Sequence, residues 1–148
     1  MKYYIGIDLG TTNSAICSYD GQTTRIWKSP DQYDVTPSAI YIDKRGNRYY
    51  GKRAYDQAPY NPENSATLFK RFMGTSTKIP FEVSGTEMTP EECSAEILKV
   101  LYGYLPEEIR NAVKYDQNTN ERMKPEVKKE KNTTSEEPHI DTTGISID

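Results

Sequence analysis

The stretch GIDLGTTNS, Gly6 to Ser14, decides how the start of this chain folds. Apolar residues lead into it at Tyr3 to Ile7, and residues of alternating polarity follow at Ser14 to Tyr19, so it joins two short strands. Glycine lets backbone amides come close to an anion, and the two threonines add hydroxyl donors. The turn Gly10-Thr11-Thr12-Asn13 can therefore cup a phosphate group.

A carboxylate stands beside this turn, because Asp8 lies at the end of the first strand. Such a carboxylate can hold a hydrated Mg²⁺ ion next to a phosphate. The turn is not a Walker A loop, since no Gly-Lys-Ser/Thr follows and the next element is a strand. The alternative is an ordinary hairpin turn, in which Asp, Gly, Thr and Asn are simply favourable turn residues. Taken alone, the stretch leaves both interpretations open.

Composition excludes several classes of function. The 148 residues carry a net charge of −3, which argues against nucleic acid as the main partner. No window approaches the roughly 20 consecutive apolar residues of a membrane span. The chain starts without an apolar signal segment, so we expect a cytoplasmic protein. Cys17 and Cys93 have no metal-ligand spacing and His139 is the only histidine, so histidine triads and multi-histidine metal sites are not expected.

Aromatic residues divide the chain near residue 110. All three Phe, the single Trp and every Tyr except Tyr115 lie before residue 111. The stretch Lys114 to Pro138 is rich in Asn, Thr, Glu and Lys and has little apolar surface to offset its ordering entropy. We expect residues 1–110 to form a folded domain and residues 111–148 to form a disordered tail, weakly β-like from Ile140 to Ile147.

Two antiparallel hairpins are predicted in the first 50 residues. A two-residue type I′ turn at Asp20-Gly21 is expected to join the strand at Ser14–Tyr19 to a returning strand at Gln22–Lys28. The second hairpin is expected between Ser38 and Tyr50, with its turn around Lys44-Arg45-Gly46.

Helices are predicted after these hairpins. Asn61-Pro62-Glu63 reads as an N-cap followed by proline at the first helical position, which predicts a helix ending at Gly74. Thr89-Pro90-Glu91-Glu92 is a capping box, and apolar residues recur behind it at helical spacing until Pro106. A shorter helix is expected around Lys52 to Gln57.

Five motifs together resemble the Hsp70 chaperone family, particularly its bacterial DnaK-like members. They are GIDLGTTNS, VTPSAI (Val35 to Ile40), GKRA (Gly51 to Ala54), NPENSATLFKRFMG (Asn61 to Gly74) and MTPEECSAEIL (Met88 to Leu98). They occur in the family's order and at its spacing, within residues 1–110. The resemblance implies an α/β fold, the first lobe of the actin/Hsp70-like ATPase fold, with a mixed sheet and helices, in truncated form.

The resemblance also implies roles for the residues of the first turn. In the family, the turn that matches Gly10, Thr11, Thr12 and Asn13 contacts the phosphates of ATP. The aspartate that matches Asp8 organises Mg²⁺. ATP and Mg²⁺ are therefore the implied cofactors.

Lys70 is the catalytic residue that the resemblance implies. The matching lysine of the family reaches the γ-phosphate and is needed for hydrolysis. A lysine suits this role, because phosphoryl transfer to water depends mostly on positioning and on charge neutralisation. The alternative from the residues alone is that Lys70 and Arg71 form the solvated face of an amphipathic helix.

The sequence departs from the family beyond Ala112-Val113, where a polar segment opens at Lys114 in place of the expected strand. In the family, nucleotide lies between two lobes, and the second lobe brings a second phosphate loop, usually Asp-x-Gly-Gly-Gly-Thr. Ile140 to Ile147 has one glycine where that loop has several, and we treat the similarity as chance. We expect negligible hydrolysis by this chain alone, because electrostatic preorganisation needs both walls of the cleft.

These observations predict an ATP-binding chain of the Hsp70 chaperone type, which acts in ATP-dependent protein folding and is here truncated. Its implied partners are ATP or ADP, unfolded client proteins and co-chaperones, without nucleic acid or membrane. Two alternatives stay open. The chain is a non-enzymatic interaction protein or an inactive truncated gene product, or it is a half-lobe that completes its site with a separate polypeptide.

Overall fold

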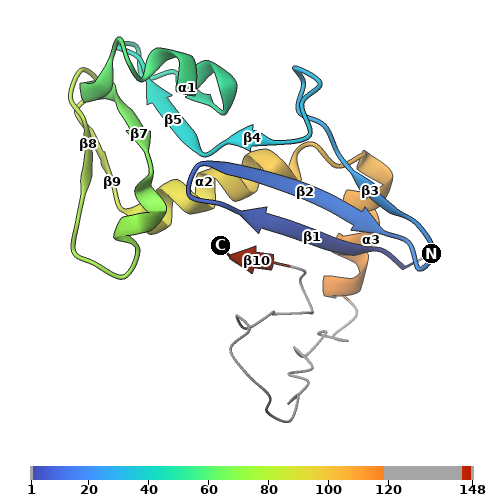
Figure 1. Cartoon of the computed structure of the whole chain (residues 1–148). Coiled ribbons are helices and arrows are strands. Elements are labelled where there is room, and N and C mark those ends of the chain that lie inside the picture. The colour runs from blue at the N-terminus through green and yellow to red at the C-terminus, as the bar shows by residue number, and fades with distance from the viewer. Residues whose placement is uncertain (1, 119–144, 148) are drawn as a thin grey trace, which may run out of the picture.

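The structure is a computed structural model of the chain and describes residues 2–118 and 145–147. A central sheet has helices α2 (Pro90–Tyr102) and α3 (Glu107–Asn118) behind one of its faces, and two smaller sheets lie at one end (Figure 1). The predicted α/β class is therefore confirmed. No helix in the described part of the chain is long and apolar enough to cross a membrane.

The central sheet is mixed. β1 (Tyr4–Leu9) and β2 (Asn13–Tyr19) form its antiparallel centre and pair along the whole length of β1. β3 (Thr24–Ile26) and β4 (Thr36–Pro37) pair antiparallel with β2. β10 (Ile145–Ile147) pairs parallel with β1, on the side away from β2.

The two faces of this sheet differ in burial because side chains alternate along each strand. Ile7, Leu9 and Ile16 point to the face that packs on α2, and all three are buried. The opposite face, here called the open face, carries polar and half-exposed residues of β1, β2 and β3. Its members are Tyr4, Gly6, Asp8, Ala15, Cys17, Tyr19, Thr24 and Ile26.

The first hairpin loop is longer than predicted. Pairing of the two strands reaches Tyr19 and Thr24, so residues 20–23 form the loop instead of Asp20-Gly21 alone. The Asp20 carboxylate accepts hydrogen bonds of 2.8 and 2.7 Å from two amides of the loop and stabilises it. Gly21 is the one residue of the loop with a positive φ, whereas a type I′ turn needs two. The prediction of a two-residue type I′ turn is therefore wrong.

The smaller sheets form a separate layer at one end of the molecule (Figure 1). β5 (Ala39–Ile42) is the centre of one of them and pairs antiparallel with β6 (Arg48–Tyr50) and β7 (Ser65–Thr67). β8 (Ile79–Phe81) and β9 (Thr86–Met88) form a two-stranded hairpin beside them. The second predicted hairpin, β5 with β6, is confirmed.

Two of the predicted helices form as expected. α1 occupies Lys52–Gln57 and packs on β5. α2 begins at the predicted cap, where the Thr89 hydroxyl oxygen accepts a 3.1 Å hydrogen bond from the Glu92 amide. The apolar face of α2 packs against the buried face of the central sheet and completes the core. The core residues are Ile7, Leu9, Ile16, Ile40, Ile42, Ala66, Phe69, Phe81, Met88, Cys93, Ile97, Leu101, Leu105 and Ile109.

The predicted helix over residues 61–74 is wrong. The structure has two short 3₁₀ turns there, η1 (Pro62–Asn64) and η2 (Phe69–Phe72), separated by β7. Pairing of residues 65–67 with β5 draws this segment into the sheet. Leu68 then takes a left-handed conformation, with φ 55° and ψ 20°, which no right-handed helix can contain.

α3 extends beyond residue 110, where the tail was predicted to begin. Residues 111–118 are therefore helical rather than disordered. Ile109 is buried in the core, and this contact anchors the helix that continues past the predicted boundary. The tail predicted at 119–144 and 148 lies outside the described residues, and the division into 1–110 and 111–148 stays a prediction.

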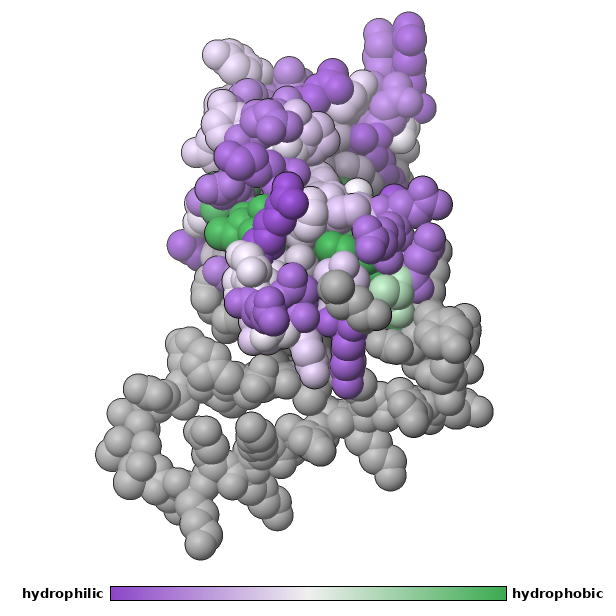
Figure 2. All heavy atoms as spheres, turned by 90° about the vertical axis from the view of Figure 1, so that its right-hand side faces the viewer, coloured by the Kyte–Doolittle hydropathy of each residue, from purple (hydrophilic) through white to green (hydrophobic). Residues whose placement is uncertain are grey.

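The surface at the side of the central sheet is largely polar. Figure 2 shows this face with small hydrophobic patches separated by hydrophilic side chains. Charged residues make up 28% of the chain, which is consistent with this surface.

The two cysteines are expected to differ in reactivity. Cys93 is buried in the core, and burial raises the pKa of its thiol to about 12. Cys17 is partly exposed on the open face. Because the thiolate is the reacting species, an aromatic disulfide reagent at pH 8 should modify Cys17 in the folded chain and leave Cys93 unmodified. The absorbance of the released aromatic thiol should correspond to one reacted cysteine in the folded chain and to two only in denaturant. Rapid reaction of both thiols without denaturant would contradict the described burial.

Candidate functional site

The phosphate turn predicted from the sequence lies at one end of the open face. Gly10 to Thr12 link β1 to β2, and Asn13 is the first residue of β2. Gly10 is buried, Thr11 is partly exposed, and Thr12 and Asn13 are exposed. The turn is therefore buried at Gly10, where it begins, and more exposed at the two threonines and the asparagine that follow.

Ser38, just before β5, stabilises this turn through hydrogen bonds to its backbone. Its hydroxyl donates a 2.8 Å hydrogen bond to the Gly10 carbonyl oxygen, and its amide donates to the Thr12 carbonyl oxygen at 2.9 Å. The Ser14 and Ser38 hydroxyl oxygens are 2.8 Å apart, and both side chains are buried. Because the single Ser38 hydroxyl proton goes to Gly10, Ser14 donates to Ser38.

Sequence reasoning missed this role of Ser14 and Ser38. Both serines belong to motifs quoted above, GIDLGTTNS and VTPSAI, but spacing alone does not show that the two motifs touch. The pairing of β4 with the start of β2 brings them together. Ser38 of VTPSAI thus stabilises the turn of GIDLGTTNS.

Lys70 lies against the same turn, although 61 positions separate it from Leu9 in the sequence. Its ammonium donates a 2.7 Å hydrogen bond to the Leu9 carbonyl oxygen, directly before Gly10. The η2 turn sets this position, because neighbouring Phe69 is buried in the core. Lys70 is partly buried whereas Arg71 is exposed, so the two do not form one solvated helix face. An ammonium has three N–H donors, and one carbonyl oxygen does not use them all.

Asp8 lies on the open face two residues before Gly10, and its side chain is exposed. Within residues 2–118 and 145–147, no group of three or more His, Cys, Asp or Glu residues is arranged to hold a metal ion. Mg²⁺ that arrives with a nucleotide takes most of its ligands from phosphate and water and needs only one or two carboxylates. A single exposed carboxylate beside the turn fits that kind of Mg²⁺ and does not fit a resident metal centre.

The structure therefore gathers the predicted site residues at one place. Asp8, the turn at 10–13 and Lys70 surround the same end of β1, with an anionic side chain, backbone and hydroxyl donors, and a cation. This combination suits a phosphate group accompanied by a metal ion. Fold and site together are compatible with an α/β lobe that binds a phosphate-bearing ligand.

Comparison with known families agrees with this class. Residues 4–116 match the profile of the family described as Hsp70 protein. The match covers more than half of the chain, and the protein belongs to the Hsp70 family. Membership confirms the resemblance and indicates a nucleotide-binding, chaperone-type function. The family generally depends on ATP and Mg²⁺ and binds client proteins and co-chaperones.

Removal of the Ser38 hydroxyl is expected to destabilise the turn. Ser38→Ala leaves the buried Gly10 carbonyl and the Ser14 hydroxyl without their partner, which should lower the free energy of unfolding by about 1–3 kcal/mol. Ser65→Ala is the control, because its hydroxyl makes one hydrogen bond, to the Asn61 carbonyl oxygen, in a less buried position. Urea unfolding followed by circular dichroism should show the larger loss for Ser38→Ala. Equal losses would argue against a special role for Ser38.

Proposed function

We propose that this chain binds ATP with Mg²⁺ through the turn at 10–13, as the first lobe of an Hsp70-type chaperone. One observation carries the proposal. The Lys70 ammonium lies 2.7 Å from the Leu9 carbonyl oxygen, so a cation from a distant motif stands at the base of a glycine-threonine turn. At this position the ammonium can pair with a phosphate bound in the turn.

Each residue of the site has a distinct part in this proposal. The backbone amides of the turn and the hydroxyls of Thr11 and Thr12 donate hydrogen bonds to phosphate oxygens, and Asn13 borders them. Lys70 neutralises charge at the terminal phosphate while the Leu9 carbonyl orients its ammonium. Asp8 would supply the carboxylate for Mg²⁺, which offsets phosphate charge when bound.

Binding without appreciable hydrolysis is the expected behaviour of this chain by itself. All the proposed residues come from one side of the site, between positions 8 and 70. Hydrolysis needs preorganised donors wherever charge develops, on both sides of the phosphates. A second polypeptide that completed the site would be expected to raise the rate.

The remaining parts of the proposal rest on the family. We expect a DnaK-like, cytoplasmic protein that acts in ATP-dependent protein folding. Unfolded client proteins and co-chaperones are the proposed macromolecular partners, and the proposed folded domain, predicted over residues 1–110, includes α3 to Asn118.

The test is an equilibrium titration of the full chain with a fluorescent ATP analogue in Mg²⁺. Lys70→Ala should weaken binding about 10- to 100-fold, because hydrogen bonds to charged groups contribute about 1.5–3 kcal/mol. Arg71→Ala is the matched control, since Arg71 follows Lys70 directly but is exposed. Asp8→Ala should weaken binding in Mg²⁺ and have less effect in excess chelator. Absence of saturable binding at millimolar nucleotide, or equal effects of the two cation variants, would overturn the proposal.

A second candidate function is interaction with another protein through the open face. Tyr4, Tyr19 and Ile26 expose large apolar side chains there, which suits contact with a partner polypeptide. If the titration shows no nucleotide binding, this candidate becomes the leading one. If binding appears only after a second-lobe polypeptide is added, the chain is a half-lobe that completes its site with a partner.

A further inference from the structure

A pocket of about 390 Å³ lies apart from the phosphate site and shares none of its residues. It opens between the loop that joins β3 to β4, the corner where β6 meets α1, and the C-terminal end of α2. This volume is within the usual range of about 300–1,000 Å³ for small-molecule sites. Its walls come from segments about 70 positions apart in the sequence, namely residues 29–37, 48–53 and the pair Val100 and Tyr104.

The base of the pocket is held in place by contacts between these segments. The hydroxyl oxygens of Thr36 and Tyr104 are 3.1 Å apart and tie β4 to the residues that follow α2. The Tyr50 hydroxyl donates a 2.7 Å hydrogen bond to the Glu96 carboxylate and ties β6 to α2. Gly51 allows the β6–α1 corner to approach Thr36 closely. These contacts fix the relative positions of the segments that line the pocket.

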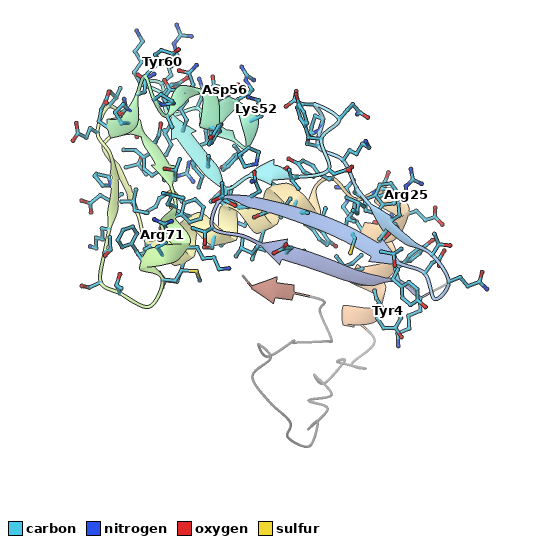
Figure 3. The ribbon with its side chains drawn as sticks, in the orientation of Figure 1. Tyr4, Arg25, Lys52, Asp56, Tyr60 and Arg71 are labelled. Carbon is cyan, nitrogen blue, oxygen red and sulfur yellow. The ribbon has the colours of Figure 1, made fainter. Side chains whose placement is uncertain are left out.

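Positive charge predominates on the lining. Arg48, Lys52 and Arg53 contribute three cations, against the single carboxylate of Asp31. Two of these cations already have carboxylate partners that do not line the pocket. Arg48 pairs with Glu96 at 3.3 Å and Lys52 with Asp56 at 2.6 Å. Figure 3 shows Lys52 and Asp56 together on α1.

Arg53 is the lining cation that remains for a ligand. It forms no ion pair with any residue in the described part of the chain. Its guanidinium instead lies over the ring of Tyr49, 4.8 Å from the ring centroid. Stacking on an aromatic ring orients the flat guanidinium. The N–H groups at the edge of the guanidinium plane stay available to a carboxylate or phosphate.

Aromatic rings supply the rest of the recognition surface. Tyr33, Tyr49 and Tyr104 all line the pocket, and Tyr33 is more than half exposed on the loop that forms one wall. Phenol rings favour a flat apolar partner by stacking. A stacked arginine beside several phenol rings matches a ligand that joins an aromatic ring to an anionic group.

We infer that this pocket binds a small planar organic anion, an aromatic ring that carries a phosphate or carboxylate group. Arg53 pairs with the anionic group, and the rings of Tyr33 and Tyr104 contact the flat part of the ligand. The site is independent of the turn at 10–13, so it does not depend on the proposed ATP binding.

The test is an NMR titration of the ¹⁵N-labelled full chain with phenyl phosphate. We expect saturable shifts at the amides of residues 48–53, with a Kd of about 1 mM, equivalent to about −4.1 kcal/mol. Arg53→Gln should weaken binding at least about tenfold, the loss of about 1.4 kcal/mol. Inorganic phosphate and phenol, which each supply half of the ligand, should both bind more weakly than phenyl phosphate.

A matched variant makes the outcome specific. Arg25→Gln removes another guanidinium that stacks on an aromatic ring, 4.2 Å from the Trp27 ring centroid, on β3 apart from α1 (Figure 3). Arg25→Gln should leave the shifts that phenyl phosphate causes at residues 48–53 unchanged. Equal weakening of these shifts by Arg53→Gln and Arg25→Gln, or no saturable shifts at residues 48–53, would overturn the inference.

Discussion

Replacement of Phe69 with alanine is expected to lower the free energy of unfolding by about 3–5 kcal/mol, the usual loss for a buried phenylalanine. Phe69 is 1% exposed and packs in the core that joins the central sheet to the smaller sheets. Its removal leaves a cavity where several elements meet. Urea unfolding of the full chain measures the loss directly.

The same substitution should also affect the site, because Phe69 precedes Lys70 in η2. We expect weaker binding of the fluorescent ATP analogue even under conditions in which the variant remains folded. Phe72→Ala is the control, since it changes the same residue type on the same turn but at a side chain that is 46% exposed. Its unfolding free energy should change by less than about 1 kcal/mol. Equal losses for the two variants would show that η2 is not anchored by Phe69.

Gly51→Ala is expected to produce the second large loss of stability. Gly51 has φ 70° and ψ −135°, a conformation that only glycine adopts readily, so alanine should cost about 1–3 kcal/mol in backbone strain. An added Cβ would also lie 2.8 Å from the Thr36 Cγ2 atom. Overpacking of this kind costs about 1–3 kcal/mol more.

Gly85→Ala substitutes a glycine of positive φ that lacks the steric contact. Gly85 has the same φ of 70°, but an added Cβ there would have no atom within 4 Å. Thermal or urea unfolding should therefore show a loss for both variants and a larger loss for Gly51→Ala. A smaller loss at Gly51 than at Gly85 would mean that the corner between β6 and α1 does not approach Thr36 as described.

Local patterns were sufficient to predict much of the fold. The alternation at Ser14–Tyr19 is a property of neighbouring residues, and it correctly indicated a strand in an antiparallel pair. The capping box at Thr89 likewise depends on residues three apart and correctly marked the start of α2. Both features are short-range, so neither required knowledge of the rest of the chain.

The errors arose where distant residues or side chains decide the structure. The motif at Asn61 has good local helix signals, but pairing with β5, more than 20 residues earlier, draws Ser65–Thr67 into a strand. The Asp20 carboxylate accepts hydrogen bonds from two loop amides, a side-chain contact that the residue types alone did not indicate. Polar composition beyond residue 110 favoured a tail, whereas burial of Ile109 in the core anchors α3, which continues to Asn118.

The site was predictable in part. Glycine and threonines after a strand indicated a phosphate turn, and Asp8 indicated a nearby metal-binding carboxylate. Lys70 entered only through the family resemblance, because no local pattern connects it to Leu9. Ser38 could not be identified at all, since its contacts with Gly10 and Ser14 exist only in the folded chain.

The most direct test of the account is a ¹H–¹⁵N NMR titration of the full chain with Mg·ATP. We predict saturable shifts that are largest at the amides of Gly10, Thr11 and Thr12, and that are strongly reduced in Lys70→Ala but retained in Arg71→Ala. Shifts centred on other parts of the chain, or no saturable shifts at millimolar Mg·ATP, would contradict nucleotide binding at this turn.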